Sequence, residues 1–287
     1  MKREDNSEVP GAAYCAEEVR THDPDRYFAA LFAPAPVRER LLALYAFAHE
    51  VAKVRETVTQ PMLGEIRLQW WRETVDAFAE GEVRRHPVAE ALSRTVDEAG
   101  LPPSGLHALI DVRSVDLDDA ETPLEDEAAL AAYADGTAGA LMALARQVQT
   151  GTPPEGATAE AARAGGRAWA CTGLLRALPY HARDRRIFIP RSILRERGVA
   201  TESVFAGRHT PELALAMADM AAMARDHLAQ ARASGAARGP AFLYLSLCDL
   251  YLKQTERPGF DPFRMPVRLS EFRRLRRMWS RAVRGTV

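Results

Sequence analysis

The chain has 287 residues and a formal net charge of −1, so its overall charge favours no nucleic-acid partner. Hydrophobic residues make up 47% of it, which is enough for a sizeable core, and no run approaches the roughly 18 apolar residues of a membrane span. Three widely spaced cysteines show no metal-ligand pattern and indicate reduced thiols. The N-terminus has no apolar signal core, so we expect a cytoplasmic protein.

The composition predicts an all-α protein, because Ala and Leu dominate and lose little entropy in a helix. Residues 1–22 are expected to be a flexible N-terminal arm, and residues 23–287 a single domain without internal repeats. The domain begins with a helix start, in which Asp23 is the N-cap and Pro24 the first helical residue.

Proline and glycine divide the rest of the chain into further helices. Gly136 and Gly139 lie inside one of them, which indicates close packing against a neighbour. Pro179 is expected to kink or end another helix. The expected helices cover residues 24–33, 37–58, 61–80, 124–148, 211–233, 240–254 and 268–284, with others from about 87, 103 and 157, and an extended piece at 187–190.

Three segments carry information beyond a helical bundle. They are LYAFAHEVAKVRE at 44–56, YADGTAG at 133–139, and the pattern T-x-L-L-R followed by R-x-F-x-P between 172 and 190. Their order and spacing resemble the squalene/phytoene synthase family from about Pro24 to Cys248. The resemblance implies a single-domain isoprenoid-synthase fold, with helices around a central cavity.

In active members of that family, two aspartate-rich motifs on facing helices hold Mg²⁺ ions, which draw off the diphosphate of the substrate. Here Ala52 and Glu56 stand at the first motif, with Lys53 beside them, and Ala177 and His181 stand at the second. One carboxylate and one imidazole do not supply the oxygen ligands of a hard cation. We therefore expect no catalytic residue, no metal site and no cofactor, unless the chain is a divergent Mg²⁺-dependent transferase.

The resemblance also implies a polar binding cavity with two walls. Helical spacing puts the residues of the first wall, Tyr45 to Glu56, on one helix face. The alternative to a cavity wall is that this face is exposed to solvent. The basic residues of the second wall could hold a diphosphate or a lipid phosphate, whereas the alternative is that Pro179 ends the helix before a solvated basic turn. The predicted substrate-binding residues are Tyr45, His49, Lys53 and Glu56 on one wall and Arg176, Tyr180, His181 and Arg186 on the other.

One branch of the family fits further segments. The patterns A-F-x-x-E, G-x-x-R-x-Q-x-W from Gly64 to Trp71, and L-R-A-x-P-Y-H from Leu175 to His181 resemble the non-catalytic branch that contains a respiratory complex I assembly factor. That resemblance implies an assembly or scaffold role, with respiratory complex subunits or assembly factors as partners.

Two alternatives to this role stay open. The first is a prenyltransferase acting on farnesyl or geranylgeranyl diphosphate through other acids, namely Glu50, Glu56, Glu65 or Asp135. The second is a non-catalytic carrier of a prenyl lipid or a quinone-like molecule. Metal-dependent diphosphate release separates the transferase from the other two, and a co-purified lipid would indicate the carrier.

The C-terminal segment is amphipathic and basic. Eight arginines and a single acid, Glu271, lie between Arg264 and Arg284. Helical spacing places Phe272, Leu275 and Trp279 on one side, together with Ala282 or Val283. We expect this side to pack on the domain. The alternative is peripheral contact with the inner face of an anionic membrane.

Overall fold

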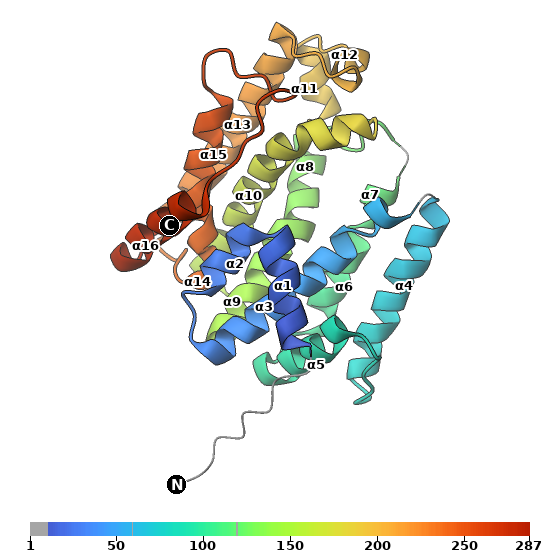
Figure 1. Ribbon diagram of the computed structural model, residues 1–287, viewed down its shortest axis with the longest axis vertical. Coiled ribbons are helices and arrows are strands. Elements are labelled where there is room, and N and C mark those ends of the chain that lie inside the picture. Colours follow the sequence, from blue (N-terminus) through green and yellow to red (C-terminus); the bar gives the residue numbers. More distant parts are fainter. Residues whose placement is uncertain (1–10, 59, 119) are drawn as a thin grey trace.

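The computed structural model describes residues 11–58, 60–118 and 120–287, and these ranges contain helices and no strand (Figure 1). The all-α prediction is therefore confirmed. The helices are α1 (Ala12–His22), α2 (Pro24–Ala30), α3 (Ala35–Ala52), α4 (Pro61–Phe78), α5 (Pro87–Ala99), α6 (Pro103–Asp111), α7 (Ser114–Leu117), α8 (Glu127–Ala134), α9 (Ala140–Thr150), α10 (Gly156–Arg183), α11 (Arg191–Glu196), α12 (Thr201–Phe205), α13 (Pro211–Ala233), α14 (Pro240–Leu243), α15 (Cys248–Thr255) and α16 (Glu271–Arg284).

The prediction of a flexible arm over residues 1–22 is wrong for its second half. Residues 12–22 form α1, which packs against α3 and α5. Cys15 and Val19 lie one turn apart on its inner face and are fully buried. The burial of these two side chains holds α1 on the domain, although its charged residues are typical of a solvated segment. Residues 1–10 lie outside the described part of the chain.

The predicted helix starts are confirmed where proline marks them. The Asp23 carboxylate accepts a hydrogen bond from the backbone N–H of Arg26, and Pro24 is the first residue of α2. One predicted end is wrong, because α3 ends at Ala52 rather than near residue 58. A short 3₁₀ turn, Arg55–Thr57, follows instead. The β-branched residues around this turn lower its helix propensity.

Helix α10 forms the centre of the molecule and packs along α13, α9 and the π-helical turn Asp135–Gly139 that joins α8 to α9. Gly166 lies directly against this turn. A Cβ at Gly166 would lie 2.3 Å from the Cα of Gly139, so only glycine permits this approach. The close packing predicted for Gly139 is thus confirmed, and its partner is the glycine of α10.

Helix α10 continues through Pro179 to Arg183, so the alternative in which Pro179 ends the helix is wrong. The residues that follow return along the domain. Segment 187–190 lies outside the helices, as predicted. It is also buried, and the Ile187 N–H donates to the Glu121 carbonyl at 2.7 Å.

The apolar side chains form two core clusters. One surrounds α3, α5 and α9, and the other surrounds the C-terminal half of α10 together with α13. Residues Glu127–Thr150 are long and apolar enough to cross a membrane, but 56% of their most apolar stretch is buried in this core. We therefore assign them to the core. All three cysteines are free and buried, which confirms the prediction of thiols, and burial raises the pKa of each to about 12.

The expectation that the apolar side of the C-terminal helix packs on the domain is wrong. Phe272 is 74% exposed, Trp279 64% and Val283 70%. The opposite face of α16 is docked, through Met278 and through Arg274 and Arg277, which pair with Asp25 and Asp249. Ion pairs to partners far away in the sequence therefore orient this helix.

Candidate functional site

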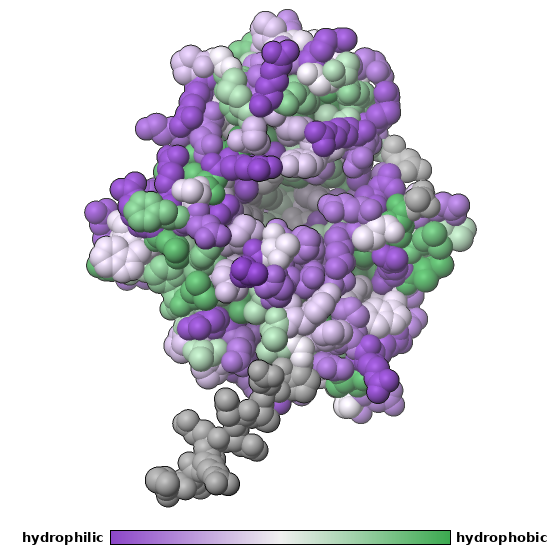
Figure 2. Space-filling model, in the orientation of Figure 1, coloured by the Kyte–Doolittle hydropathy of each residue, from purple (hydrophilic) through white to green (hydrophobic). Residues whose placement is uncertain are grey.

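A hollow opens in the middle of the face shown in Figure 2. In the same orientation, Figure 1 places α8 and α10 on one side of this hollow and α1 and α3 on the other. The predicted walls of the cavity belong to α3 and α10. The arrangement of helices around a central hollow is therefore the one expected from the sequence.

The first predicted wall is covered by α1 rather than by solvent. Tyr45 is buried, with the Arg26 guanidinium 5.6 Å from its ring centre. His49 stacks on His22 of α1, with ring centres 4.4 Å apart. Lys53 pairs with Glu50 at 2.7 Å. Tyr45, His49 and Lys53 thus contact neighbouring side chains, so the solvated alternative is wrong for these three residues.

Glu56 lies apart from this face. It stands on the 3₁₀ turn beyond the end of α3 and is exposed. Because α3 ends at Ala52, Ala52 and Glu56 do not form an i, i+4 pair on one helix. The only carboxylate predicted for the first wall is therefore not aligned with Tyr45 and His49.

The second predicted wall borders a pocket of about 520 Å³. Arg176 and Tyr180 line it from α10, together with Gly173 and Ala177. Its other side is formed by residues 262–268, the segment that leads into α16, and Tyr45 and His49 are not among its lining residues. A second pocket of about 290 Å³ includes Lys53 and lies against α4. Arg176 and Tyr180 thus line one pocket and Lys53 another, and the role of the eight predicted residues in binding stays a prediction.

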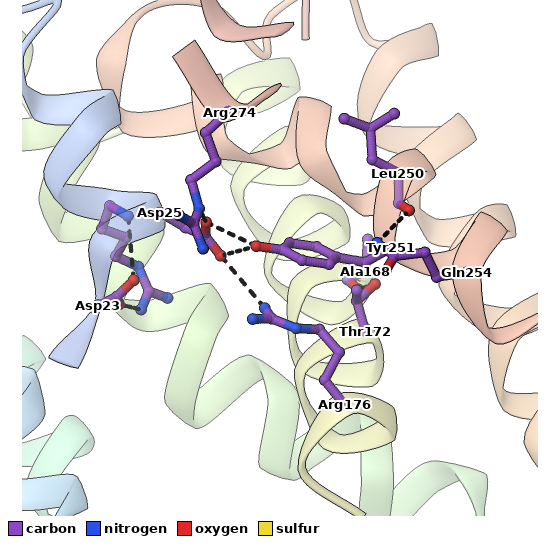
Figure 3. Close-up of polar contacts among 10 residues, drawn as sticks. Asp23, Asp25, Ala168, Thr172, Arg176, Leu250, Tyr251, Gln254 and Arg274 are labelled. Atoms are coloured by element: carbon purple, nitrogen blue, oxygen red, sulfur yellow. Dashed lines mark hydrogen bonds and ion pairs between the residues drawn. The ribbon is translucent and has the colours of Figure 1, made fainter. Parts of the chain in front are cut away.

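Arg176 takes part in a buried ionic cluster around Asp25, shown in Figure 3. Asp25 is only 3% exposed, and its carboxylate lies 3.4 Å from the Arg176 guanidinium. It also accepts hydrogen bonds from Arg274 of α16 and from the Tyr251 hydroxyl at 2.7 Å. Arg176 lies over the Tyr251 ring at 3.7 Å. One carboxylate therefore joins α2, α10, α15 and α16.

His181 lies in the last turn of α10, and Arg186 follows the end of the helix. The His181 ring packs on Phe188, and burial lowers the pKa of His181 to about 4, so its imidazole is neutral at pH 7. Arg186 is 6% exposed and donates to the backbone carbonyls of Asp116 and Val115. Its guanidinium thus binds backbone carbonyls of α7 (Ser114–Leu117).

Three of the acids considered for a transferase are each paired with a cation, whereas the fourth, Glu56, is exposed. Glu50 pairs with Lys53, and Glu65 lies 3.7 Å from Arg72. Asp135 accepts two hydrogen bonds from Arg167, at 2.7 and 2.6 Å. A carboxylate engaged in this way has to leave its partner before it can bind a metal ion.

Sequence reasoning missed the residues that make these contacts across the fold, above all Asp25, Arg113, Asp116, Tyr133 and Tyr251. Asp116 shows the same arrangement as Asp25, because Arg113 and the Tyr133 hydroxyl both donate to its carboxylate. The sequence offered one signal: in Y-A-D-G, the aromatic Tyr133 lies two positions before the charged Asp135. The contacts of Asp25 join residues that are far apart in the chain, whereas Arg113 is only three residues from Asp116.

The comparisons with known proteins agree with this fold. The sequence model of the family described as squalene/phytoene synthase matches residues 19–280. The structure superposes on a crystal structure of a dehydrosqualene synthase with a TM-score of 0.76 and 20% sequence identity, over 94% of each chain. The chain belongs to the squalene/phytoene synthase family.

Within this family, two relatives frame the question of function. The chain is 32% identical to complex I assembly factor 6 of Mus musculus over 260 residues, which is 89% of this chain and 77% of the mouse protein. It is 26% identical to presqualene diphosphate synthase of Rhodopseudomonas palustris over 256 residues, 85% of this chain and 88% of the enzyme. The similarity to the assembly factor is the stronger of these two.

Proposed function

We propose that this chain is a non-catalytic member of the family that acts as an assembly or scaffold factor for respiratory complex I. The similarity to assembly factor 6 over most of both chains supports the role. Subunits or assembly factors of that complex are the partners that the role implies.

One observation carries the non-catalytic half of the proposal: Glu50, Glu65 and Asp135, the acids considered for a transferase, are each engaged by an arginine or a lysine. Mg²⁺ demands near-octahedral oxygen ligands and is held mainly by carboxylates. Ala52 and Ala177 offer no ligand at the two motif positions. A diphosphate can still be attracted by the basic groups, but its departure has no metal ion to stabilise the developing charge.

We expect no metal-dependent release of pyrophosphate from farnesyl or geranylgeranyl diphosphate by the purified protein, with either Mg²⁺ or Mn²⁺. The measurement is pyrophosphate release over time, with an active family member as the positive control. Metal-dependent release that disappears in the Glu56→Gln variant would contradict the proposal and favour the divergent transferase. Release that persists in that variant would also contradict it and would place the metal ligands elsewhere.

A carrier function remains the second candidate, because the pocket of about 520 Å³ between α10 and segment 262–268 is large enough to hold part of a lipid. Extraction of the purified protein with organic solvent, followed by mass spectrometry, tests it. A stoichiometric prenyl lipid or quinone would favour the carrier. The ionisation chemistry is not needed for this function, so the pyrophosphate assay does not separate the carrier from the scaffold.

We further propose that the protein works in the cytoplasm at the inner face of a membrane and contacts it through α16. The exposed stripe of this helix consists of apolar side chains one turn apart, and exposed arginines lie beside it. A helix of this kind lies in the plane of an anionic bilayer, with its apolar side inserted and its basic side chains near the phosphates. The stripe is Phe272, Leu275, Trp279 and Val283, and the arginines are Arg273, Arg276 and Arg284.

Replacing Phe272 and Trp279 together by serine is expected to weaken binding to anionic liposomes at least tenfold, because burying one large apolar side chain contributes roughly 2 kcal/mol. Flotation of full-length protein with vesicles of defined composition measures the effect. Leu215→Ser on α13, at a position 53% exposed, is the matched control. Equal binding by the double variant and the control would contradict the proposed contact.

A further inference from the structure

A carboxylate and two imidazoles converge where α1 packs on α3, apart from the contacts of α10 described above. Glu18 and His22 lie one turn apart on α1, and His49 comes from α3. The Oε2 atom of Glu18 lies 3.9 Å from the Nε2 atom of His22 and 3.8 Å from the Nε2 atom of His49. The two rings stack, with 13° between their planes.

These distances are too long for hydrogen bonds, so the three groups approach one another without being joined. Glu18 Oε2 is buried and accepts no hydrogen bond from the described residues. A buried carboxylate oxygen in this state lacks the partner that its burial calls for. The nearest donor, the Lys53 ammonium, lies 3.7 Å away, and the imidazoles of His49 and His22 follow at 3.8 and 3.9 Å. Imidazole ring nitrogens are common metal ligands.

The spacing fits a bound metal ion. One ligand atom from each of Glu18, His22 and His49 lies within 4.8 Å of the others. A zinc ion roughly 2.1 Å from each ligand holds neighbouring ligands roughly 3.4 Å apart. The Glu18 oxygen is already close to that separation from both nitrogens. Small side-chain rotations, which turn the stacked rings towards one centre, complete the arrangement.

We propose that Glu18, His22 and His49 form a binding site for a divalent transition-metal ion, with Zn²⁺ the best match, and that the ion ties α1 to α3. Two imidazoles and one carboxylate form a known three-ligand set for zinc, with further positions left for water. Imidazole ligands favour zinc, copper, iron or nickel over Mg²⁺. This site is therefore independent of the family's magnesium chemistry and of the proposed assembly function.

The surroundings allow the ion to enter. The His22 side chain is 47% exposed, which leaves an entry path from solvent.

Lys53 is the competitor for this site. Its ammonium lies 3.7 Å from Glu18 Oε2 and 2.7 Å from Glu50 Oε1. A metal ion displaces the weaker of these contacts, and Lys53 stays paired with Glu50. The lysine therefore weakens metal binding without preventing it, because its charge is largely offset by Glu50.

The test is titration of metal-free, full-length protein with ZnCl₂ by calorimetry, together with Co²⁺ absorption spectra. We expect one ion per chain and a rise in melting temperature with the ion present. His22→Asn and Glu18→Gln are each expected to weaken zinc binding at least tenfold. Loss of a residue that only supports a metal ligand already weakens metal binding about tenfold or more, and loss of the ligand itself should do no less. Lys53→Met is expected to tighten binding several-fold, because it removes a positive charge beside a ligand oxygen.

His107→Asn is the matched control, because His107 contacts the Asp76 carboxylate at 2.8 Å but the described residues supply no third ligand there. It should leave the zinc affinity unchanged. Circular dichroism verifies that each variant is folded, and Lys53→Met tests the site by a gain rather than a loss. The proposal would be overturned if the wild-type protein bound no zinc, or if His22→Asn and Glu18→Gln bound it as tightly as wild type. Weaker zinc binding by Lys53→Met would also overturn it.

Discussion

Replacing Gly166 by alanine is expected to lower the free energy of unfolding by roughly 3 kcal/mol, at the upper end of the range for an overpacked core site. The added methyl group would lie 2.3 Å from the Cα and 2.4 Å from the backbone N of Gly139. Both contacts are with backbone, so no side chain can move aside. Helix α10 would have to shift away from the turn that joins α8 to α9.

Gly173→Ala on the same helix is the matched control. A Cβ there meets nothing within 4 Å, and alanine favours the helix over glycine by about 1 kcal/mol. Urea denaturation of both variants should therefore show opposite shifts of the midpoint, downward for Gly166→Ala and slightly upward for Gly173→Ala. A Gly166→Ala midpoint equal to that of wild type would show that the helices do not approach this closely.

Replacing Asp25 by asparagine is expected to lower the free energy of unfolding by roughly 3–5 kcal/mol, the range for breaking a buried ion pair from one side. The change keeps the size of the side chain but removes the charge that Arg176 and Arg274 share. Both guanidinium groups would then be partly buried without their counter-ion, which is the reason for the large effect.

Urea denaturation measures this effect, with Asp97→Asn at an exposed position of α5 as the control. Limited digestion with trypsin adds a second measurement, because α16 is held through Arg274 and is rich in cleavage sites. Asp25→Asn and Arg274→Gln should both speed cleavage within α16. Unchanged stability and unchanged cleavage in both variants would contradict the role of Asp25 as the anchor of this helix.

Local sequence patterns predicted much of the fold. Proline at the first helical position marks the starts of α2, α4, α5 and α13, and these starts are where the sequence placed them. The close packing of the glycine-rich stretch after α8 was also predicted. Glycine lowers the stability of a helix, so its presence inside one indicates that a neighbour approaches closely. These features depend on residues that are close together in the chain.

What the sequence did not predict depends on distant contacts. Asp25 and Arg274 are 249 positions apart, and neither carries a local signal that names the other. Their pairing turns the arginine face of α16 inward and leaves Trp279 exposed, against the usual burial of an apolar face. Similarly, α1 is fixed by the burial of Cys15 and Val19 against α3 and α5 rather than by its own composition.

The same reason explains the candidate site. Helical spacing correctly put Tyr45, His49 and Lys53 on one face, but what covers that face is α1, which the sequence had assigned to an arm. Arg176 was predicted to hold an anion, and the anion it contacts is the protein's own Asp25. Residue type and periodicity thus identified which side chains are polar and aligned, whereas the partners were set by tertiary packing.

The assembly of respiratory complex I in a deletion strain tests the central proposal most directly. Loss of this gene from its host should lower NADH:quinone oxidoreductase activity and the amount of fully assembled complex on native gels. Re-expression of wild type and of Glu56→Gln should restore both, and the prenyl-lipid content of the cells should stay unchanged. An intact complex I, together with loss of squalene-type or phytoene-type lipids, would contradict the assembly role and assign the chain to isoprenoid synthesis.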